Sequence, residues 1–533
     1  MLNSALFKNA LISVSDKTGL IEFLKPYVSS GMRVVSTGGT LKHLRENGIA
    51  AIEVSEQTGF PEVMDGRVKT LHPRVHMALL ARHGNSDDEA LLKKEKLEAF
   101  DLVIVNLYPF EESSRKNLAD HELIEFIDIG GPSLLRAAAK NHERLAVVCE
   151  PEDYQWIATK GELTLSDRRR LAARVFAHTS RYDDLIAKTL IGSDLEMQAL
   201  RPQTLVGRKV SELRYGENPQ QQATWYRCPE AKSGLHEAKI LHGKPLSYNN
   251  ILDLDAACGA VVEFQEPAAV AVKHNNPCGV GTDLSVSRAV SLAIQADPMS
   301  VFGGIIAVNR QVEIDAAEEM AKIFLECIVA PSFSVEALAR LQKKKDLRLL
   351  EWPELSVNSM SLHGQNQARD SGADVALHFR SVAGGFLAQS PDKTSEWSES
   401  WKVIMADGST ARLSEALKRD LMLAWKVCAR LKSNAIAIAA SGRTVGLGMG
   451  QVNRVDAVEH AIERMQKHHA SVSGSVLASD AFFPFADSIE RIANAGIAWV
   501  IQPGGSIRDD EVMAKAKERG VNLVMTGIRH FRH

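Results

Sequence analysis

The sequence has no cysteine arrangement that would serve as a zinc-ligand pair or as a disulfide framework. Its six cysteines are widely scattered and none forms a CxxC pair: Cys149, Cys228, Cys258, Cys278, Cys327 and Cys428. Scattered free thiols are typical of a reducing compartment. No segment approaches the roughly 18 continuous apolar residues of a membrane-spanning helix, and the N-terminus lacks the pattern of a secretory signal. We therefore expect a soluble cytoplasmic protein with no membrane partner.

An excess of positive charge is also missing. Lys and Arg number 63 against 66 for Asp and Glu, so the formal net charge is -3. Such a chain has no general attraction to polyanions, and nucleic acid is not an expected partner. The basic end, TGIRHFRH, is too short to change this expectation. Small molecules are the expected partners.

The length of 533 residues exceeds what one hydrophobic core supports, so at least two domains are expected. Short apolar runs alternate with helical patterns in the first 150 residues, as in ALISVS (10–15), RVVST (33–37), LVIVNLY (102–108) and LAVVCE (145–150). Runs of this kind suit strands buried on both faces, which predicts an α/β domain with a mainly parallel sheet. The spacing of apolar residues predicts a long helix over 168–191.

The helical spacing of apolar residues is lost near residue 200, where we place the boundary between domains 1–200 and 201–533. The second domain has its own apolar runs, AVAV (269–272), GIIAV (304–308), AIAIAA (435–440) and AWVIQ (498–502). It too is expected to be α/β, and its composition allows two related subdomains. The polar, unpatterned stretch 351–378 is expected to be an exposed excursion.

Two loops in the first domain have the character of an anion cradle. SVSDKTGL (13–20) and STGGT (36–40) each follow a strand and open a helix, and they supply hydroxyls, a lysine and flexible glycines. Ordinary strand-to-helix turns explain either loop equally well. GRVKTLHPRVH (66–76) adds cations in a loop; its pair His72 and His76 has zinc-like spacing, but no third ligand is evident, so no metal is expected.

IDIGGPSLLRAAAKNH (127–142) places Asp128 before a Gly-Gly turn, where it could act as an acid or base or simply as a loop carboxylate. In the second domain, SELRYGENPQQ (211–221) and LSYNN (246–250) display groups suited to hydrogen bonding, although exposed turns explain them too. SDAFFPFAD (479–487) is either a core loop or an aromatic slot for a flat ring.

VAVKHNNPCG (270–279) brings an apolar strand to its end at Lys273 and His274. Ligands bind at the ends of strands in open α/β sheets, and a histidine beside a lysine suits proton transfer between weakly basic atoms. A zinc site built on His274 and Cys278 would lack further ligands. The alternative is an ordinary strand that ends in a polar turn.

Taken in order, these segments resemble the bifunctional purine-biosynthesis family in which 5-aminoimidazole-4-carboxamide ribonucleotide (AICAR) formyltransferase is joined to IMP cyclohydrolase. The resemblance runs through SVSDKTGL, STGGT, GRVKTLHP, NLYPF, DIGGPSLLRAAAKNH, LRYGENPQQ, LSYNN, KHNNPCG, FGGIIA, SNAIAIA, SDAFFPFAD, QPGGSIRD and RHFRH. It implies a methylglyoxal-synthase-like cyclohydrolase domain and a cytidine-deaminase-like formyltransferase domain without zinc. It also implies 10-formyltetrahydrofolate as co-substrate and a homodimer whose formyltransferase sites use both subunits.

The resemblance also assigns residues. Lys273, His274 and Asn434 become the catalytic set for formyl transfer, and Lys69, Tyr108, Asp128 and Lys140 become the catalytic set for cyclisation. Contacts to the nucleotides fall on Ser13, Ser15, Lys17, Thr37, Gly39, Thr40, Arg67, Thr70, Arg214, Tyr215, Asn250 and Arg529. The folate would bind at Arg454, Phe482, Pro484, Phe485 and Asp487. Departures from the family pattern are Met77 and Ala78, where relatives often have two glycines, and Glu326, where some have aspartate. A nucleotide- or RNA-binding regulator is the rival from another class.

Overall fold

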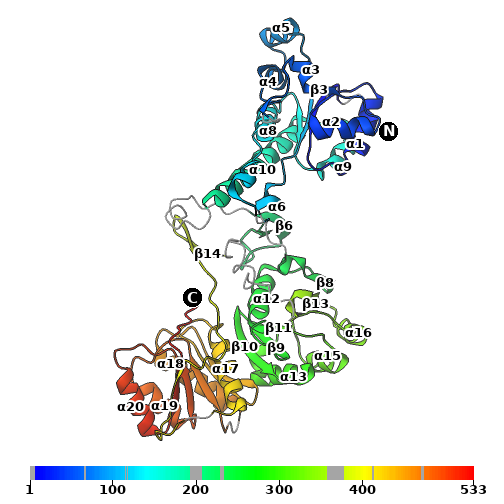
Figure 1. Ribbon diagram of the computed structural model, residues 1–533. Helices are drawn as coiled ribbons and strands as arrows, with labels where there is room; N and C mark the ends of the chain where they lie inside the picture. Colours follow the sequence, from blue (N-terminus) through cyan, green and yellow to red (C-terminus); the bar gives the residue numbers. More distant parts are fainter. Residues whose placement is uncertain are drawn as a thin grey trace. The chain divides into compact units, whose positions relative to one another are not determined.

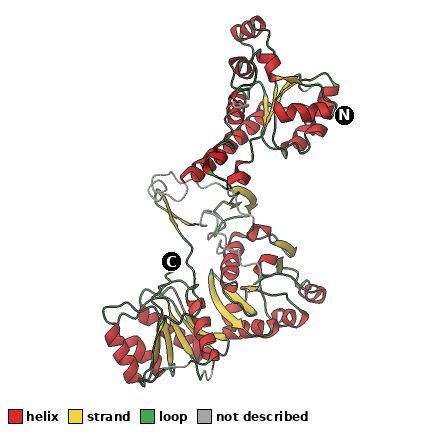
Figure 2. Cartoon of the chain, in the orientation of Figure 1, coloured by secondary structure: helices red, strands yellow, loops and turns green. Residues whose placement is uncertain are grey.

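The computed structural model describes residues 7–64, 68–114, 116, 118–191, 207–228, 233–356, 377–410, 413–469 and 473–533. The chain divides into two compact units, Met1–Thr204 and Leu205–His533. Both units are α/β (Figures 1 and 2). Within the described residues, no helix has the length and apolar character needed to cross a membrane.

The first unit is built on a parallel five-stranded sheet in the order β3-β2-β1-β4-β5. Its strands are β1 (Asn9–Ser13), β2 (Arg33–Ser36), β3 (Ile52–Glu53), β4 (Leu102–Val105) and β5 (Ala146–Val148). Apolar residues of β1 and β4 alternate between two hydrophobic clusters, one on each face of the sheet. This burial on both sides explains the continuous apolar runs, and the predicted parallel α/β fold is confirmed.

Helices cover both faces of this sheet. One cluster includes residues of α1 (Leu20–Ser29), α2 (Gly38–Glu46) and α9 (Asp153–Ala158). The other includes residues of α4 (Pro73–Leu80), α8 (Gly130–Lys140) and α10 (Leu165–Ile191). The last helix begins three residues before the predicted start, because Thr164 and Asp167 form reciprocal caps: the Thr164 amide donates to the Asp167 carboxylate at 3.0 Å, and the Asp167 amide donates to the Thr164 hydroxyl at 3.2 Å.

The second unit is built on a mixed twelve-stranded sheet that consists of two six-stranded halves. From the middle outward, the first half runs β10 (Asn276–Thr282), β9 (Ala268–Lys273), β11 (Ile305–Val308), β12 (Cys327–Ala330), β13 (Arg348–Glu351) and β8 (Lys239–His242). The second half runs β18 (Arg443–Gly448), β17 (Ile436–Ala440), β19 (Val476–Ser479), β20 (Trp499–Gln502), β21 (Asn522–Met525) and β16 (Lys402–Ile404). The two related subdomains are therefore present, with the same order of strands.

The helices repeat as well. One face of the sheet packs against α12 (Tyr248–Val261) and α17 (Glu415–Cys428) in a cluster that spans both halves. The other face packs against α13 (Val286–Ala296), α15 (Ile314–Ala321) and α16 (Val335–Leu341) in the first half. In the second half it packs against α18 (Arg454–His468), α19 (Asp487–Asn494) and α20 (Asp509–Arg519).

Corresponding residues of the two halves are 167 positions apart around the central strands. Ser247 and Ser414 each cap a helix of 14 residues. A Cβ on Gly279 or on Gly446 would stand 2.2 Å from a carbonyl oxygen of the packed helix, so both positions require glycine. The halves meet where Gly281 of β10 pairs with Arg443 of β18. At this seam the Val280 amide donates to the Thr444 hydroxyl at 3.0 Å.

The predicted excursion over 351–378 is wrong at its start. Glu351 still belongs to β13, and the side chains of Trp352 and Leu355 are buried in the core. The aromatic and aliphatic side chains outweigh the polar composition of the surrounding stretch. Residues 357–376 lie outside the described part of the chain. Two small antiparallel sheets complete the unit, β6 (Arg208–Leu213) with β7 (Ala223–Arg227), and β14 (His378–Val382) with β15 (Gly385–Gln389).

Candidate active sites

The two hydroxyl-rich loops of the first unit lie side by side at the carboxyl ends of β1 and β2. The hydroxyls of Ser13 and Thr37 are 3.2 Å apart. The Thr40 hydroxyl accepts a hydrogen bond from the Val14 amide and donates to the Val14 carbonyl, both at 2.9 Å. Thr40 therefore joins the loops through main-chain contacts, while the start of α2 leaves amide groups suited to an anion.

Asn106, at the end of β4, organises the first loop and was not singled out from the sequence. Its side-chain oxygen accepts from the amides of Ser15 at 2.6 Å and Asp16 at 3.0 Å. Its amide nitrogen donates to the Asp16 carbonyl at 2.9 Å. The place of Asn106 after a strand that neighbours β1 was the available signal. Lys17 turns back to donate to the Ser15 carbonyl at 3.2 Å.

Four predicted residues gather where α2 and α8 begin. The Lys69 amine is 3.3 Å from the place where a Cβ on Gly38 would stand, and the Thr70 hydroxyl is 2.8 Å from the corresponding place on Gly130. The Asp128 carboxylate accepts from the Gly131 amide at 2.8 Å. The Tyr108 main-chain amide also faces this carboxylate, and 49% of the Tyr108 residue surface is exposed.

Burial raises the pKa of the Asp128 carboxyl, while the amides of Gly131 and Tyr108 and the charge of Lys69 act in the opposite direction. A partly buried carboxyl near an ammonium group can move a proton to or from a bound substrate. The glycine at position 131 makes this arrangement possible, because a Cβ there would stand 2.4 Å from an Asp128 oxygen.

Lys140 is not brought into this group. Lys140 is exposed at the last position of α8, about 15 Å along the helix axis from Gly130 at 1.5 Å per residue. Arg67 lies outside the described residues. Gly39 is the second residue of α2, and nothing stands within 4 Å of a Cβ placed on it.

In the second unit, Lys273 and His274 lie at the tip of a β-hairpin rather than at the free end of a strand. Strand β9 ends at Lys273, and His274 and Asn275 form a two-residue turn with φ of 51° and 63°. Positive φ at both positions is the mark of a type I′ turn, which usually takes Asn-Gly or similar pairs. Because His274 and Asn275 are not the usual pair for this turn, the hairpin could not be predicted from the sequence. The Lys273 amine donates to the Phe302 carbonyl at 2.8 Å.

Asp253 of α12 supports this turn, and its carboxylate accepts from the Asn275 amide at 2.6 Å. Burial raises the pKa of Asp253, while hydrogen bonds from the Asn275 and His274 amides and the charge of His274 oppose the shift. No local pattern points to Asp253, because the turn it supports is 21 residues further along the chain.

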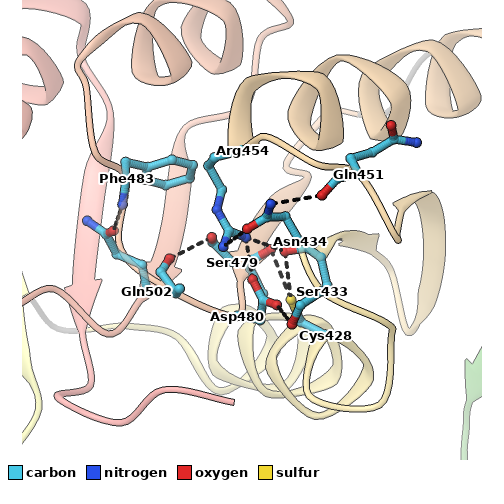
Figure 3. Close-up of polar contacts among 12 residues, drawn as sticks. Cys428, Ser433, Asn434, Gln451, Arg454, Ser479, Asp480, Phe483 and Gln502 are labelled. Atoms are coloured by element: carbon cyan, nitrogen blue, oxygen red, sulfur yellow. Dashed lines mark hydrogen bonds and ion pairs between the residues drawn. The ribbon is translucent and has the colours of Figure 1, made fainter. Parts of the chain in front are cut away.

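The loop that carries Asn434 packs against the same hairpin, where the Lys432 amide donates to the Asn276 side chain at 3.1 Å. Figure 3 shows Asn434 fixed at both ends of its amide. Its nitrogen donates to the Gln451 carbonyl at 2.8 Å, and its oxygen accepts from Arg454 at 2.7 Å. An amide held in this way has one orientation, as a substrate-orienting group requires.

Arg454 is buried and its guanidinium pairs with Asp480, which is 0% exposed. The same guanidinium donates to the Ala435 carbonyl at 3.1 Å. The sequence-based hypothesis placed Arg454 at the folate. In the structure this cation contacts Asp480 and Asn434, and these contacts hold Asn434 in place.

The phenylalanines of SDAFFPFAD divide between the two roles considered for them. Phe483 is fully buried, and its amide donates to the Gln502 side chain at 3.0 Å. Phe482 and Phe485 are 37% and 50% exposed, and the Arg508 guanidinium lies 4.7 Å from the Phe485 ring centre. Asp487 opens α19. For the two exposed rings the aromatic slot stays a prediction.

The remaining predicted contacts are spread over the second unit. Arg214 lies over the Tyr215 ring at 5.6 Å, and the loop that follows is tied to α12 by the Asn249 side chain, which donates to the Glu217 carbonyl at 3.3 Å. Asn250 is buried and forms a reciprocal cap with Ser247. Arg529 is exposed and lies 4.5 Å from the Phe531 ring centre.

Known proteins match this chain over 99% of its length. A family model described as AICARFT/IMPCHase bienzyme matches residues 138–464, and one described as MGS-like domain matches residues 19–133. The chain is 47% identical over 532 residues to the bifunctional purine biosynthesis protein PurH of Halalkalibacterium halodurans, covering 99% of this chain and 100% of that protein. The protein of the same name from Bacillus mycoides is 46% identical with the same coverage. A solved chain titled "Crystal structure of ForH" is 30% identical, with a TM-score of 0.32, over 34% of this chain and 96% of that one.

Proposed function

The chain belongs to the AICARFT/IMPCHase bienzyme family, and on this premise we propose how its two units carry out the two reactions. Its function is that of a bifunctional enzyme of purine biosynthesis, which transfers a formyl group to AICAR and closes the formylated product to IMP. The cyclohydrolase is assigned to the first domain, 1–200, and the formyltransferase to the second, 201–533.

For formyl transfer, the donor is 10-formyltetrahydrofolate. The 5-amino nitrogen of AICAR attacks the formyl carbon, the bond from that carbon to the folate N10 breaks, and one proton passes from the amine to N10. The amine is conjugated to the imidazole ring and is a weak nucleophile, so proton removal assists the attack. His274 takes the amine proton and Lys273 serves the folate side, while Asn434 orients the substrate. Phe482, Pro484, Phe485 and Asp487 would hold the folate.

For cyclisation, the carboxamide nitrogen attacks the formyl carbon and one water is lost. Asp128 orients or deprotonates the amide, and Lys69 and Tyr108 stabilise the hydroxyl that leaves. The loops that carry Ser13, Ser15, Thr37 and Thr40 would hold the phosphate and ribose. The observation that carries this assignment is the gathering of Lys69, Thr70 and Asp128 at the starts of α2 and α8.

One incubation tests the proposed function. The purified full chain receives AICAR and 10-formyltetrahydrofolate, and the release of tetrahydrofolate and the appearance of IMP are followed together. Both products are expected in equal amounts after a short lag. Release of tetrahydrofolate without IMP would remove the cyclohydrolase from the proposal, and the absence of both would overturn it.

The active form is further proposed to be a cytoplasmic homodimer whose formyltransferase sites use both subunits. Sedimentation at assay concentrations tests the dimer, which is expected to persist across the range in which formyl transfer is constant.

A further inference from the structure

Each half of the twelve-stranded sheet has a central hairpin whose turn is held by one aspartate of the preceding helix. In the first half, Asp253 of α12 accepts from the Asn275 amide at 2.6 Å. In the second half, Asp420 of α17 accepts from the amides of Ser441 at 2.9 Å and Gly442 at 2.8 Å. Asp253 precedes His274 by 21 residues and Asp420 precedes Ser441 by 21 residues. The same contact between a helix aspartate and a hairpin turn is therefore present in both halves.

The two turns differ in what they carry. The second turn has Ala440 and Ser441 before a glycine, and Ser441 and Gly442 have φ of 52° and 76°. The first has Lys273 and His274 before an asparagine, and both His274 and Asn275 have positive φ. Positive φ is uncommon for residues other than glycine, although asparagine and histidine adopt it more often than most. Each turn therefore contains a residue other than glycine at positive φ, and each is held by a carboxylate that receives its amide groups.

Lys273 and His274 can act on one substrate only while the turn keeps its shape. The Lys273 amine reaches the Phe302 carbonyl at 2.8 Å, and the Asn276 side chain accepts from the Lys432 amide at 3.1 Å. These contacts fix the two ends of the turn, at Lys273 and at Asn276. Asp253 fixes the middle, from the α12 side. Displacement of a catalytic group by about 1 Å can lower a rate by about 100-fold.

We infer that Asp253 is a positioning residue for formyl transfer, which holds the turn that presents Lys273 and His274 to the reacting atoms. This inference rests on the proposed function of the second unit. Asp253 needs no contact with substrate in this role. Its counterpart Asp420 performs the same structural task at a turn without the lysine and histidine, so the chain supplies its own control.

The test compares Asp253→Ala, Asp253→Asn and Asp420→Ala in the full-length chain. For Asp253→Ala we expect kcat of formyl transfer to fall about 10- to 100-fold, with KM for AICAR and for 10-formyltetrahydrofolate nearly unchanged. Asp253→Asn keeps an oxygen that accepts from the Asn275 amide, and it should restore most of the rate. Asp420→Ala should shift the thermal midpoint as much as Asp253→Ala does, and keep kcat within about twofold of the parent chain.

Wild-type kcat in Asp253→Ala, or an equal loss of kcat in Asp420→Ala, would overturn the inference. If Asp253→Ala does not fold, the same measurement is made with Asn275→Gly added, because glycine adopts positive φ without strain; a folded double variant as inactive as His274→Ala would overturn the inference, because Asp253 would then act in the reaction itself. Cyclisation of supplied formylated nucleotide is the internal control and should not change. A failure of the proposed function would look different. The wild-type chain would then show no formyl transfer, or His274→Ala would keep the wild-type rate, whatever Asp253 does.

Discussion

The hydroxyl of Tyr182 accepts a hydrogen bond from the main-chain amide of Asp128 at 2.7 Å. The same hydroxyl donates to the Phe126 carbonyl at 3.3 Å. Burial raises the pKa of Tyr182 to about 12, so the group is a neutral phenol at physiological pH. Tyr182 belongs to α10, and the longest helix of the first unit thereby holds the segment that carries the proposed catalytic carboxylate.

Replacing Tyr182 by phenylalanine should loosen this segment. The Asp128 amide would lose its partner, at a cost of about 1 to 3 kcal/mol in the free energy of unfolding, and cyclisation should slow while formyl transfer is unchanged. Tyr27→Phe is the matched control, because the buried Tyr27 hydroxyl has no hydrogen-bond partner in the described part of the chain. Equal effects of the two variants on cyclisation would contradict the role of Tyr182.

The two activities should be separable by single substitutions. His274→Ala is expected to abolish formyl transfer and to leave cyclisation of supplied formylated nucleotide intact, and Lys69→Ala is expected to do the reverse. General acid–base groups commonly contribute about 100- to 10,000-fold, so the losses will be plain in separate assays of each step. Loss of both activities in a correctly folded single variant would contradict independent sites.

Gly131→Ala should impair cyclisation without changing any side chain that touches substrate. The new Cβ would stand 2.4 Å from an Asp128 oxygen and 2.7 Å from Leu107, so the carboxylate must move. Gly161→Ala is the control, since nothing lies within 4 Å of a Cβ at that position. We expect a loss of about 10-fold or more in kcat for Gly131→Ala and none for Gly161→Ala; normal cyclisation in Gly131→Ala would show that the position of Asp128 is not critical.

The stability of the first unit should carry the signature of a buried carboxyl. Because the pKa of Asp128 is raised in the folded state, the folded protein holds this proton more tightly than the unfolded chain does. Its contribution is full below the ordinary carboxyl pKa of about 3.9 and is lost as pH rises through the higher folded value.

Asp128→Asn should remove this part of the pH dependence. Near neutral pH the variant is expected to unfold at equal or higher denaturant concentration than the parent, although it has lost cyclisation. Urea unfolding of both proteins at several pH values measures the difference. If the stability of Asp128→Asn relative to the parent fell as pH rose, the pKa of Asp128 would be lowered in the folded state and not raised.

Removing Arg454 should be costly, because it would leave the Asp480 charge buried and unpaired. Arg454→Met is expected to lower the free energy of unfolding of the second unit by about 3 to 5 kcal/mol and to slow formyl transfer through Asn434. The control is Arg491→Met, whose partner is Glu459 and whose side chains are 47% and 41% exposed; such pairs contribute about 0 to 1 kcal/mol. Similar losses of unfolding free energy in Arg454→Met and Arg491→Met would show that burial of the ion pair does not decide the cost.

Much of the fold could be predicted from the sequence, because buried strands and amphipathic helices have local patterns. The strands of the first sheet around ALISVS and LVIVNLY and the helix over 168–191 are examples. The hairpin at His274 could not be predicted in this way, since its turn lacks glycine. Asn106 and Asp253 act on loops distant in sequence, and only the paired strands bring these groups together.

The aromatic cluster shows the same limit at the scale of one residue. Phe482, Phe483 and Phe485 have the same chemistry, and composition alone could not assign one to the core and two to the surface. The division follows from which ring faces α19 and its neighbours in the packed second half. Arg454 is a similar case, because its burial depends on Asp480, 26 residues further along the chain.

The seam between β10 and β18 gives the large sheet an unusual continuity. Where the two halves meet, Val280 donates its amide hydrogen to a threonine side chain, Thr444, and not to a carbonyl of the neighbouring strand. One hydroxyl thus replaces a main-chain acceptor, beside the main-chain bond in which the Thr282 amide donates to the Gly442 carbonyl at 2.7 Å. Thr444→Val would remove the side-chain bond and leave the main-chain bond, so force that pulls the two halves apart should separate β10 from β18 more easily in the variant.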